Sequence, residues 1–179
     1  MNDGLIPNRY AKALYKAAAE KHEDALVYNQ MRQLDAAYAA TPQLRKAVGN
    51  PYLPAEQKQQ LLRTAAGAAA AGVADKFMGL VINKNRVDFM RAIALAYVKL
   101  YRQRNSIASV EVVTATQLPK ASLEAIVAAV QRQLQGMTME LATRVDPALI
   151  GGFVVNVDSM VLDASVKKQL EKLRLKLLS

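Results

Sequence analysis

Apolar positions recur every three to four residues from Pro7 to about Arg104, a period that predicts a run of helices. In the second predicted helix, Val27, Met31, Leu34 and Tyr38 follow at spacings of four, three and four, so they share one face. Prolines and glycines interrupt the pattern at short intervals. Five or six helices joined by connections of about two to six residues form an antiparallel bundle.

The first, fifth and last of these predicted helices each carry an apolar stripe. The fifth ends at Asn83-Lys84-Asn85, because asparagine tolerates the left-handed backbone that closes a helix. The stripes contain, in order, Tyr10, Ala13, Leu14, Ala17, Ala18 and Lys21; Val73, Phe77, Leu80 and Val81; and Val87, Met90, Ile93, Ala94, Tyr97 and Tyr101.

After Asn105 the period changes, and β-branched residues become frequent. The pattern predicts strands at 107–114, 138–145, 151–157 and 160–162. A helix is expected after Pro119, with a buried stripe of Leu123, Ile126 or Val127, Val130 and Leu134. Another is expected from about Ala164, with Leu170 and Leu173 on its apolar side. The fold class is therefore α+β and mainly α, with a helical bundle at 1–105 and a small α/β domain at 106–179. The edges of so small a sheet predict packing on a partner or on the bundle.

Composition narrows the chemistry that this chain can perform. Its 179 residues include no cysteine and one histidine, His22, which excludes disulfides, thiol nucleophiles, cysteine-bound metals and sites with two histidines. An apolar fraction of 52% excludes general disorder. No apolar run approaches the ~20 residues of a membrane span, and no leader pattern follows Met1. We expect a soluble protein kept in a reducing compartment.

The positive charge is unevenly divided between the two predicted domains. The chain has 24 lysines and arginines and 15 acidic residues, a net charge of +9. Residues 1–104 hold 16 basic and 8 acidic side chains, whereas residues 105–179 hold 8 and 7. A basic bundle keeps nucleic-acid binding open as a hypothesis, and Tyr97 to Arg104 mixes aromatics with cations. Core packing of Tyr97 and Tyr101 is the simpler interpretation of the same run.

Other candidate sites have structural explanations. Gly67 and Gly72 have the spacing of a phosphate loop, but Val73-Ala74 stands where lysine and a hydroxyl residue are required. Gly151-Gly152 begins a strand, so a close backbone approach or a bulge at the strand start is favoured over a dinucleotide fingerprint. Asp163 or Ser165 is expected to cap the last helix, and His22 to cap or remain solvated.

Several stretches together resemble the family of the delta subunit of bacterial F-type ATP synthases, which includes the mitochondrial oligomycin-sensitivity-conferring subunit. The sequence Arg-Tyr-Ala-Lys-Ala-Leu at 9–14 is similar to the opening helix of that family, and 80–97 to its fifth-to-sixth helix junction. The most specific stretch runs from 145 to 155, Val-Asp-Pro-Ala-Leu-Ile-Gly-Gly-Phe-Val-Val, and continues through Val-Leu-Asp-Ala-Ser at 161–165. Ala164 and Asn85 stand where the family often has glycine.

The resemblance implies a non-catalytic stator subunit without cofactor or metal, lying at the cytoplasmic face of a bacterial inner membrane only through its complex. It implies a six-helix N-terminal bundle that binds N-terminal helices of the alpha subunits in a groove between its first and fifth helices. It also implies a C-terminal domain that binds the peripheral-stalk b subunits, with 149–153 and the last helix as the region to study. By position, the groove would contain Tyr10, Ala13, Lys76, Leu80 and Arg86. The family motif of the C-terminal domain comprises Asp146, Pro147, Gly151, Gly152, Phe153, Asp163 and Ser165.

Two rival hypotheses have distinct requirements. A nucleic-acid-binding module requires a continuous basic stripe and salt-sensitive binding, whereas the cations here are spread over several predicted helices. A small enzyme requires a cluster of polar side chains in a pocket, and the sequence shows no candidate cluster. For the groove, the alternative remains that Tyr10 and Leu80 belong to the core.

Overall fold

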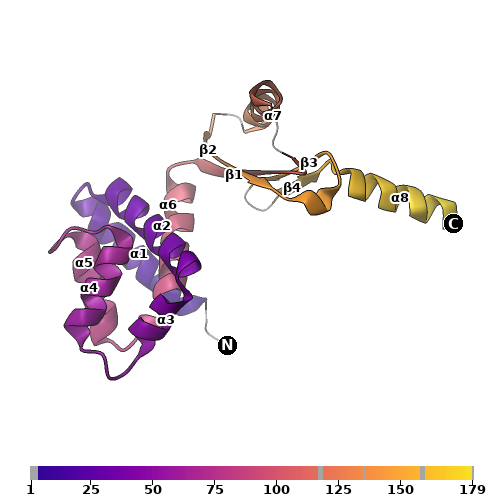
Figure 1. Cartoon of the computed structure of the whole chain (residues 1–179). Coiled ribbons are helices and arrows are strands. Elements are labelled where there is room, and N and C mark those ends of the chain that lie inside the picture. Colours follow the sequence, from indigo (N-terminus) through magenta and orange to yellow (C-terminus); the bar gives the residue numbers. More distant parts are fainter. Residues whose placement is uncertain (1–3, 117–118, 135, 158–159, 179) are drawn as a thin grey trace. The chain divides into compact units, whose positions relative to one another are not determined.

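The computed structural model describes residues 4–116, 119–134, 136–157 and 160–178 (Figure 1). The chain divides into two compact units, Met1–Tyr101 and Arg102–Ser179, here named the helical unit and the sheet unit. Each has its own core and is described by itself.

The helical unit consists of helices joined by short connections, as the apolar period predicts. A 3₁₀ turn, Val87–Phe89, precedes the last helix. The helices are α1 (Leu5–Glu20), α2 (Asp24–Ala40), α3 (Pro42–Gly49), α4 (Ala55–Ala66), α5 (Val73–Asn83) and α6 (Met90–Arg104).

Residues with left-handed backbone end several of these helices. Gly67 follows α4 at a φ of 60°, and Asn85 follows α5 at a φ of 53°, which confirms the helix end predicted at Asn83-Lys84-Asn85. His22, at a φ of 56°, closes α1. The next residue's N–H donates back to the carbonyl of Ala18 at 2.9 Å, a hydrogen bond typical of a helix C-terminus.

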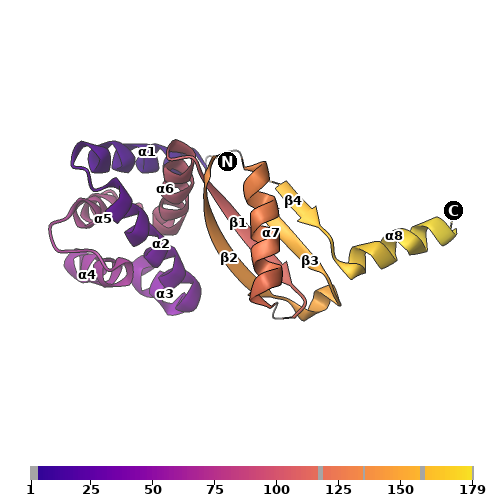
Figure 2. The same cartoon turned by 90° about the horizontal axis from the view of Figure 1, so that it is seen from above.

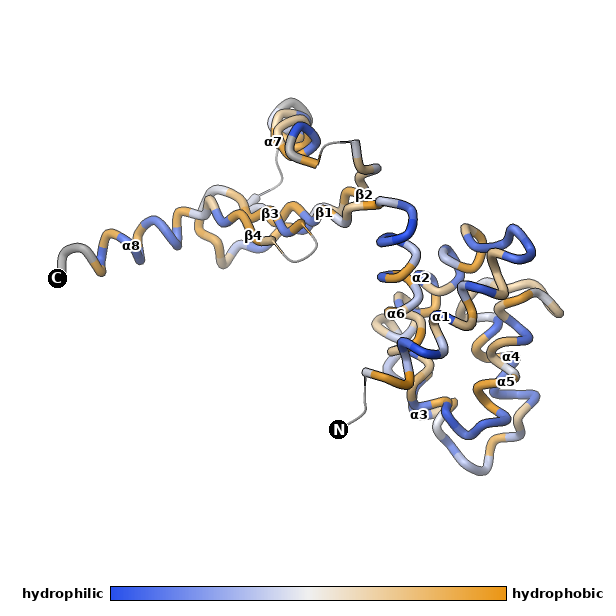
Figure 3. The backbone as a smooth tube through the Cα atoms, turned by 180° about the vertical axis from the view of Figure 1, so that it is seen from behind, coloured by the Kyte–Doolittle hydropathy of each residue, from blue (hydrophilic) through white to orange (hydrophobic). Residues whose placement is uncertain are grey.

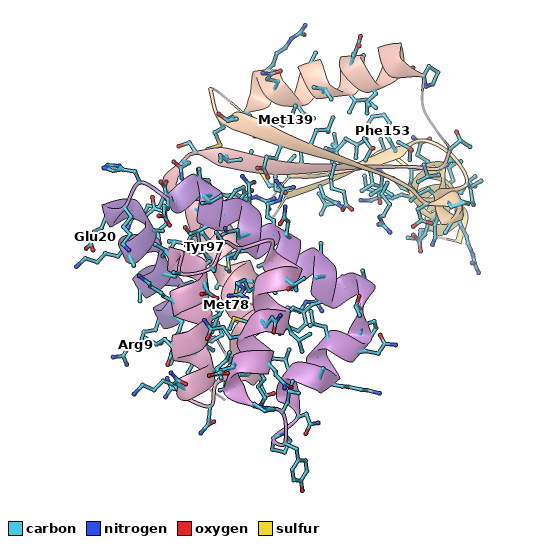
Figure 4. All side chains as sticks on the ribbon, turned by 60° about the vertical axis from the view of Figure 1, so that its left-hand side comes forward. Arg9, Glu20, Met78, Tyr97, Met139 and Phe153 are labelled. Carbon is cyan, nitrogen blue, oxygen red and sulfur yellow. The ribbon has the colours of Figure 1, made fainter. Side chains whose placement is uncertain are left out.

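The core of the helical unit is built from aliphatic, methionine and tyrosine side chains. The predicted α2 face is confirmed, since Val27, Met31, Leu34 and Tyr38 are all buried. Tyr97 of α6 is fully buried and Tyr101 nearly so. In Figure 4 Tyr97 and Met78 lie among the helices of this unit. A core position for these tyrosines removes the aromatic surface on which the nucleic-acid hypothesis depended.

The predicted stripes of α1 and α5 are split by the structure. In α1 the core receives Pro7, Ala11, Leu14 and Ala18, whereas Ala13 and Ala17 are exposed. In α5 the core side includes Ala74, Met78, Val81 and Ile82, while Leu80 stays 48% exposed. The alanines of α1 suit either side of a helix, and α5 is apolar on most of its sides, so hydropathy alone could not separate the core face from the adjacent open face in either helix.

The sheet unit is a four-stranded sheet in the order β2-β1-β3-β4. β1 pairs in parallel with β2 and antiparallel with β3, and β3 pairs antiparallel with β4. Its elements are β1 (Ile107–Thr114), α7 (Lys120–Gln133), β2 (Thr138–Val145), a 3₁₀ turn (Pro147–Leu149), β3 (Phe153–Val157), β4 (Met160–Asp163) and α8 (Val166–Leu178).

One face of this sheet is covered by α7, as Figure 1 and Figure 2 show. Val110, Val112 and Val155 are buried there. They pack against side chains of α7 and of neighbouring strands: Leu123, Ile126, Val130, Leu134, Met139, Phe153 and Val157. Met139 and Phe153 lie between the helix and the sheet in Figure 4. The stripe predicted for the helix after Pro119 is therefore confirmed.

Two predicted boundaries were wrong by two residues each. The third strand begins at Phe153 because Gly152, at a φ of 75°, has a backbone that no strand residue adopts. The last helix begins at Val166 because Ser165 is its cap: its Oγ accepts the N–H of Lys168 at 3.2 Å.

Candidate functional site

A groove of about 680 Å³ opens on the surface of the helical unit between α1 and α5. Its small and apolar lining is formed by Ala13, Leu14, Ala17, Val73, Phe77 and Leu80. The remaining lining residues are Arg9, Tyr10, Lys21, Lys76, Lys84 and Arg86.

Contacts at both ends show that α1 and α5 run antiparallel along this groove. At one end the Tyr10 ring meets Phe77 edge-on, with centroids 6.2 Å apart. Arg86 follows α5 and donates from Nη1 to the Tyr10 hydroxyl at 2.9 Å. At the other end the Val73 N–H, at the start of α5, donates to Oε2 of Glu23 at 3.4 Å.

The floor of the groove is open because its α1 side is made of alanines. Ala13 and Ala17 are exposed and one turn apart, so nothing but a methyl group rises from either position. Opposite them Phe77 is half-buried and Leu80 is 48% exposed. Small residues facing exposed apolar ones allow another helix to approach closely, as in helix-in-groove recognition.

The charged lining of the groove is entirely cationic. Arg9, Lys21, Lys76, Lys84 and Arg86 line it, and no carboxylate does so. The Arg86 guanidinium also lies over the Tyr10 ring, 5.4 Å from its centroid. Among the described residues, none of the five cations forms an ion pair.

The groove brings together all five residues placed there by the resemblance, Tyr10, Ala13, Lys76, Leu80 and Arg86. Leu80 is outside the core, and Tyr10 is only half-buried. Seven further lining residues were not among the predicted site residues: Arg9, Leu14, Ala17, Lys21, Val73, Phe77 and Lys84. Five of these seven belonged to the predicted stripes of the first and fifth helices, and this periodicity was the signal that could have identified them.

The C-terminal motif has structural roles in the sheet unit. Asp146 caps the turn that begins at Pro147, accepting the Ala148 N–H at 3.0 Å. A side chain at Gly152 would collide with the carbonyl oxygen of Ala164, which confirms the predicted close approach there. Gly151 abuts Val166, the first residue of α8. Phe153 packs on the sheet core.

Asp163 and Ser165 act together at the start of α8. The Asp163 carboxylate accepts the Ser165 N–H at 3.0 Å, and Lys168 lies 3.8 Å away. Hydrogen bonds from Ser165 lower the pKa of Asp163, because they stabilise the ionised carboxylate. The capping role expected at this position is thus shared between two residues.

A second candidate surface is the exposed apolar part of the sheet unit. Met160, Val161 and Leu162 of the edge strand β4 are mostly exposed. Leu170 and Leu173 share one side of α8, and Leu173 is 55% exposed. Figure 3 shows hydrophobic and hydrophilic residues alternating along α8. Such a helix normally buries its apolar side against another element.

No three His, Asp or Glu side chains among the described residues come together as metal ligands. Within the same ranges, no helix combines the length and the hydropathy needed to span a membrane.

Comparison with known proteins matches residues 6–177 to the family model described as ATP synthase delta (OSCP) subunit. The chain belongs to this family. An ATP synthase subunit delta from Phocaeicola vulgatus is 35% identical, over 96% of this chain and 92% of its own. One from Caulobacter sp. (strain K31) is also 35% identical, over 93% and 90%.

The fold of the chain is also similar to that of a chain in a solved ATP synthase structure. A chain in the cryo-EM structure of the Toxoplasma gondii mitochondrial ATP synthase hexamer superposes with a TM-score of 0.75 at 22% identity, covering 97% of both chains. Members of the delta family are non-catalytic stator subunits of the F-type ATP synthase and are peripheral components of that membrane-bound complex. The resemblance noted from the sequence is thereby confirmed.

Proposed function

We propose that this delta-family chain joins the catalytic head of the ATP synthase to its peripheral stalk through two separate surfaces. The groove between α1 and α5 receives the N-terminal helix of an alpha subunit. The exposed apolar residues of β4 and of α8 bind the b subunits. Bacterial relatives support a position at the cytoplasmic face of a bacterial inner membrane.

The groove carries the first part of this proposal. Its exposed alanine floor and half-exposed Phe77 and Leu80 leave apolar surface that the fold itself does not cover. An amphipathic helix anchored by residues at i, i+3, i+4 and i+7 would bury that surface. Burial of apolar area contributes about 25 cal/mol per Å², so such an interface stabilises the joint without any covalent chemistry.

The mechanical role follows from the rotary cycle. Proton flow drives ATP synthesis only when the head is prevented from turning with the rotor. Each surface on this chain must therefore stay bound while torque is applied, which favours broad, preorganised interfaces over reactive side chains. α1 and α5 form the groove with their exposed sides, and their other sides are buried in the core of the helical unit. The groove is therefore already present in the chain without its partner.

The groove is tested by calorimetric titration of the full chain with a synthetic peptide of the alpha-subunit N-terminus. We expect 1:1 binding at micromolar affinity or tighter. Ala13→Asp should weaken binding at least tenfold, because a carboxylate would be desolvated on the groove floor. Ala36→Asp, the same change at an exposed alanine of α2, should bind like the wild type. Equal binding by all three proteins, with folding confirmed by circular dichroism, would exclude this groove.

The second surface is tested with a purified soluble fragment of the b subunits. Leu173→Asp places a charge on the exposed apolar side of α8, and we expect at least a tenfold loss of affinity. Gln131→Asp adds the same charge at an exposed polar position of α7, outside β4 and α8, and serves as the control. An unchanged affinity for Leu173→Asp would show that the stalk binds elsewhere.

A further inference from the structure

We infer that the α1–α5 groove selects a partner helix by charge as well as by shape: the helix carries acidic residues at one end, and that end lies at Arg86. This inference rests on the proposed function of the groove and adds the chemistry and the direction of its occupant. The observation behind it is the unequal distribution of cations along the groove.

Three of the five lining cations gather at one end. Arg86 contacts Tyr10, so the end where α5 finishes is also the end where α1 begins. Lys84 lies two residues before Arg86, and Arg9 directly precedes Tyr10. This group of three, named the Arg86 end, has no carboxylate among its lining residues. Asp88, close in sequence, lines a different pocket together with Arg45 and Arg91.

The opposite end has a different charge balance. Lys21 lies between exposed Glu20 and the Glu23 carboxylate, which accepts the Val73 N–H. Figure 4 shows Glu20 and Arg9 projecting outward from well-separated parts of the helical unit. An acidic segment is therefore attracted to the Arg86 end and repelled by the carboxylates at the other.

Arg86 is held in position before any partner arrives. One of its five N–H groups donates to the Tyr10 hydroxyl, and its plane lies over the Tyr10 ring. The remaining donors can meet a carboxylate in a bidentate pair. Because Tyr10 already restrains the side chain, less conformational entropy is lost on binding than for a free arginine. Arg86 is thus the specificity-determining residue of the groove.

The test uses two designed helical peptides of about 18 residues, long enough to follow α1 at about 1.5 Å per residue. Both have leucines at i, i+3, i+4 and i+7; one has three glutamates in a terminal turn and the other has three glutamines. By calorimetry on the full chain, we expect the acidic peptide to bind about tenfold tighter at low salt, with the ratio falling as salt screens the charges.

Variants assign this preference to the Arg86 end. Arg86→Gln should reduce the tenfold ratio to about threefold or less, and Arg86→Lys should restore part of it. Lys46→Gln removes an equal charge from an exposed position of α3 outside the groove and should leave the ratio unchanged. A ratio unaffected by Arg86→Gln overturns the assignment.

The direction of the bound peptide along the groove is measured with a spin label on a cysteine at the acidic end of the peptide. The chain itself contains no cysteine, so only the peptide is labelled. Amide signals of Tyr10 and Lys84 should broaden more than those of Lys21 and Val73. The reverse pattern, or equal affinity of the two peptides, overturns the inference while leaving the groove proposal intact. If neither these peptides nor the alpha-subunit peptide binds, the groove proposal itself fails.

Discussion

Two buried tyrosines govern how the helical unit responds to alkaline pH. Burial raises the pKa of Tyr38 to about 12, although the nearby Arg45 acts in the opposite direction. Burial also raises the pKa of Tyr97 well above its usual value, with the Asp24 charge adding to the effect. The Tyr97 hydroxyl donates to the Asp24 carbonyl at 3.2 Å, so its proton is held in a hydrogen bond that ionisation would break.

These shifts predict a loss of stability at high pH. A raised native pKa means that the neutral tyrosine stabilises the fold fully below pH ~10, and that this contribution is lost as pH rises toward the native pKa. Each tyrosine can contribute a slope of at most about 1.4 kcal/mol per pH unit. In thermal melts from pH 8 to 12, the Tyr38→Phe/Tyr97→Phe variant should lose less stability above pH 10 than the wild type. Parallel losses would contradict the assignment.

Individual residues were predictable where their chemistry is local. Asn85 was expected to close a helix because of its backbone tolerance, and Ser165 or Asp163 to cap one because of its side-chain oxygen. Both expectations need only neighbours within a few residues. The Arg86–Tyr10 contact joins residues 76 positions apart, and no local rule predicts it.

At the scale of elements, the joint between β3 and α8 depends on a glycine. Gly152 combines a φ of 75° with a backbone so close to Ala164 that no side chain fits. Gly136 has a similar φ of 88°, but a side chain there would meet nothing within 4 Å. A side chain at Gly136 would therefore meet backbone strain alone, whereas one at Gly152 would meet both backbone strain and a steric collision.

This pair provides a matched prediction. Gly136→Ala should cost about 1 kcal/mol from the left-handed backbone alone. Gly152→Ala should cost clearly more, about 2–4 kcal/mol, because Ala164 and α8 must also move. Chemical denaturation followed by far-ultraviolet circular dichroism measures both. Equal costs would show that the contact with Ala164 relaxes freely.

For whole helices and strands, the sequence was informative about bounds and less so about faces. The strands at 107–114 and 138–145 have the predicted bounds, because the first is rich in β-branched residues and the second alternates apolar and polar positions. The predicted stripes of α1 and α5 mixed core residues with exposed ones, since α1 is rich in alanine and α5 is apolar on most of its sides. The same alanines, Ala13 and Ala17, are what leaves the groove open.

At the scale of the whole molecule, each unit has its own core, and we expect the two to unfold separately. All seven tyrosines lie between residues 10 and 101, so tyrosine fluorescence reports on the helical unit alone. Gly152→Ala should lower the unfolding midpoint of the sheet unit, measured by hydrogen exchange in 107–114, and leave the fluorescence midpoint within about 1 °C. A common shift of both midpoints would show that the units unfold as one.

At the same scale, the structure shows where part of the excess positive charge of residues 1–104 lies. Composition alone left open whether the excess was spread evenly or gathered. The structure places five cations around one groove without a lining carboxylate. A charge excess that first suggested nucleic acid is instead suited to an acidic protein helix.

Local periodicity and motif residues in fixed order were enough to predict the two-part organisation, most element bounds, the buried faces of α2 and α7, and the family. The open faces of α1 and α5 and the contact between Arg86 and Tyr10 emerge only in the folded chain. A groove forms when two helices distant in sequence pack antiparallel, and that packing is set by the whole core.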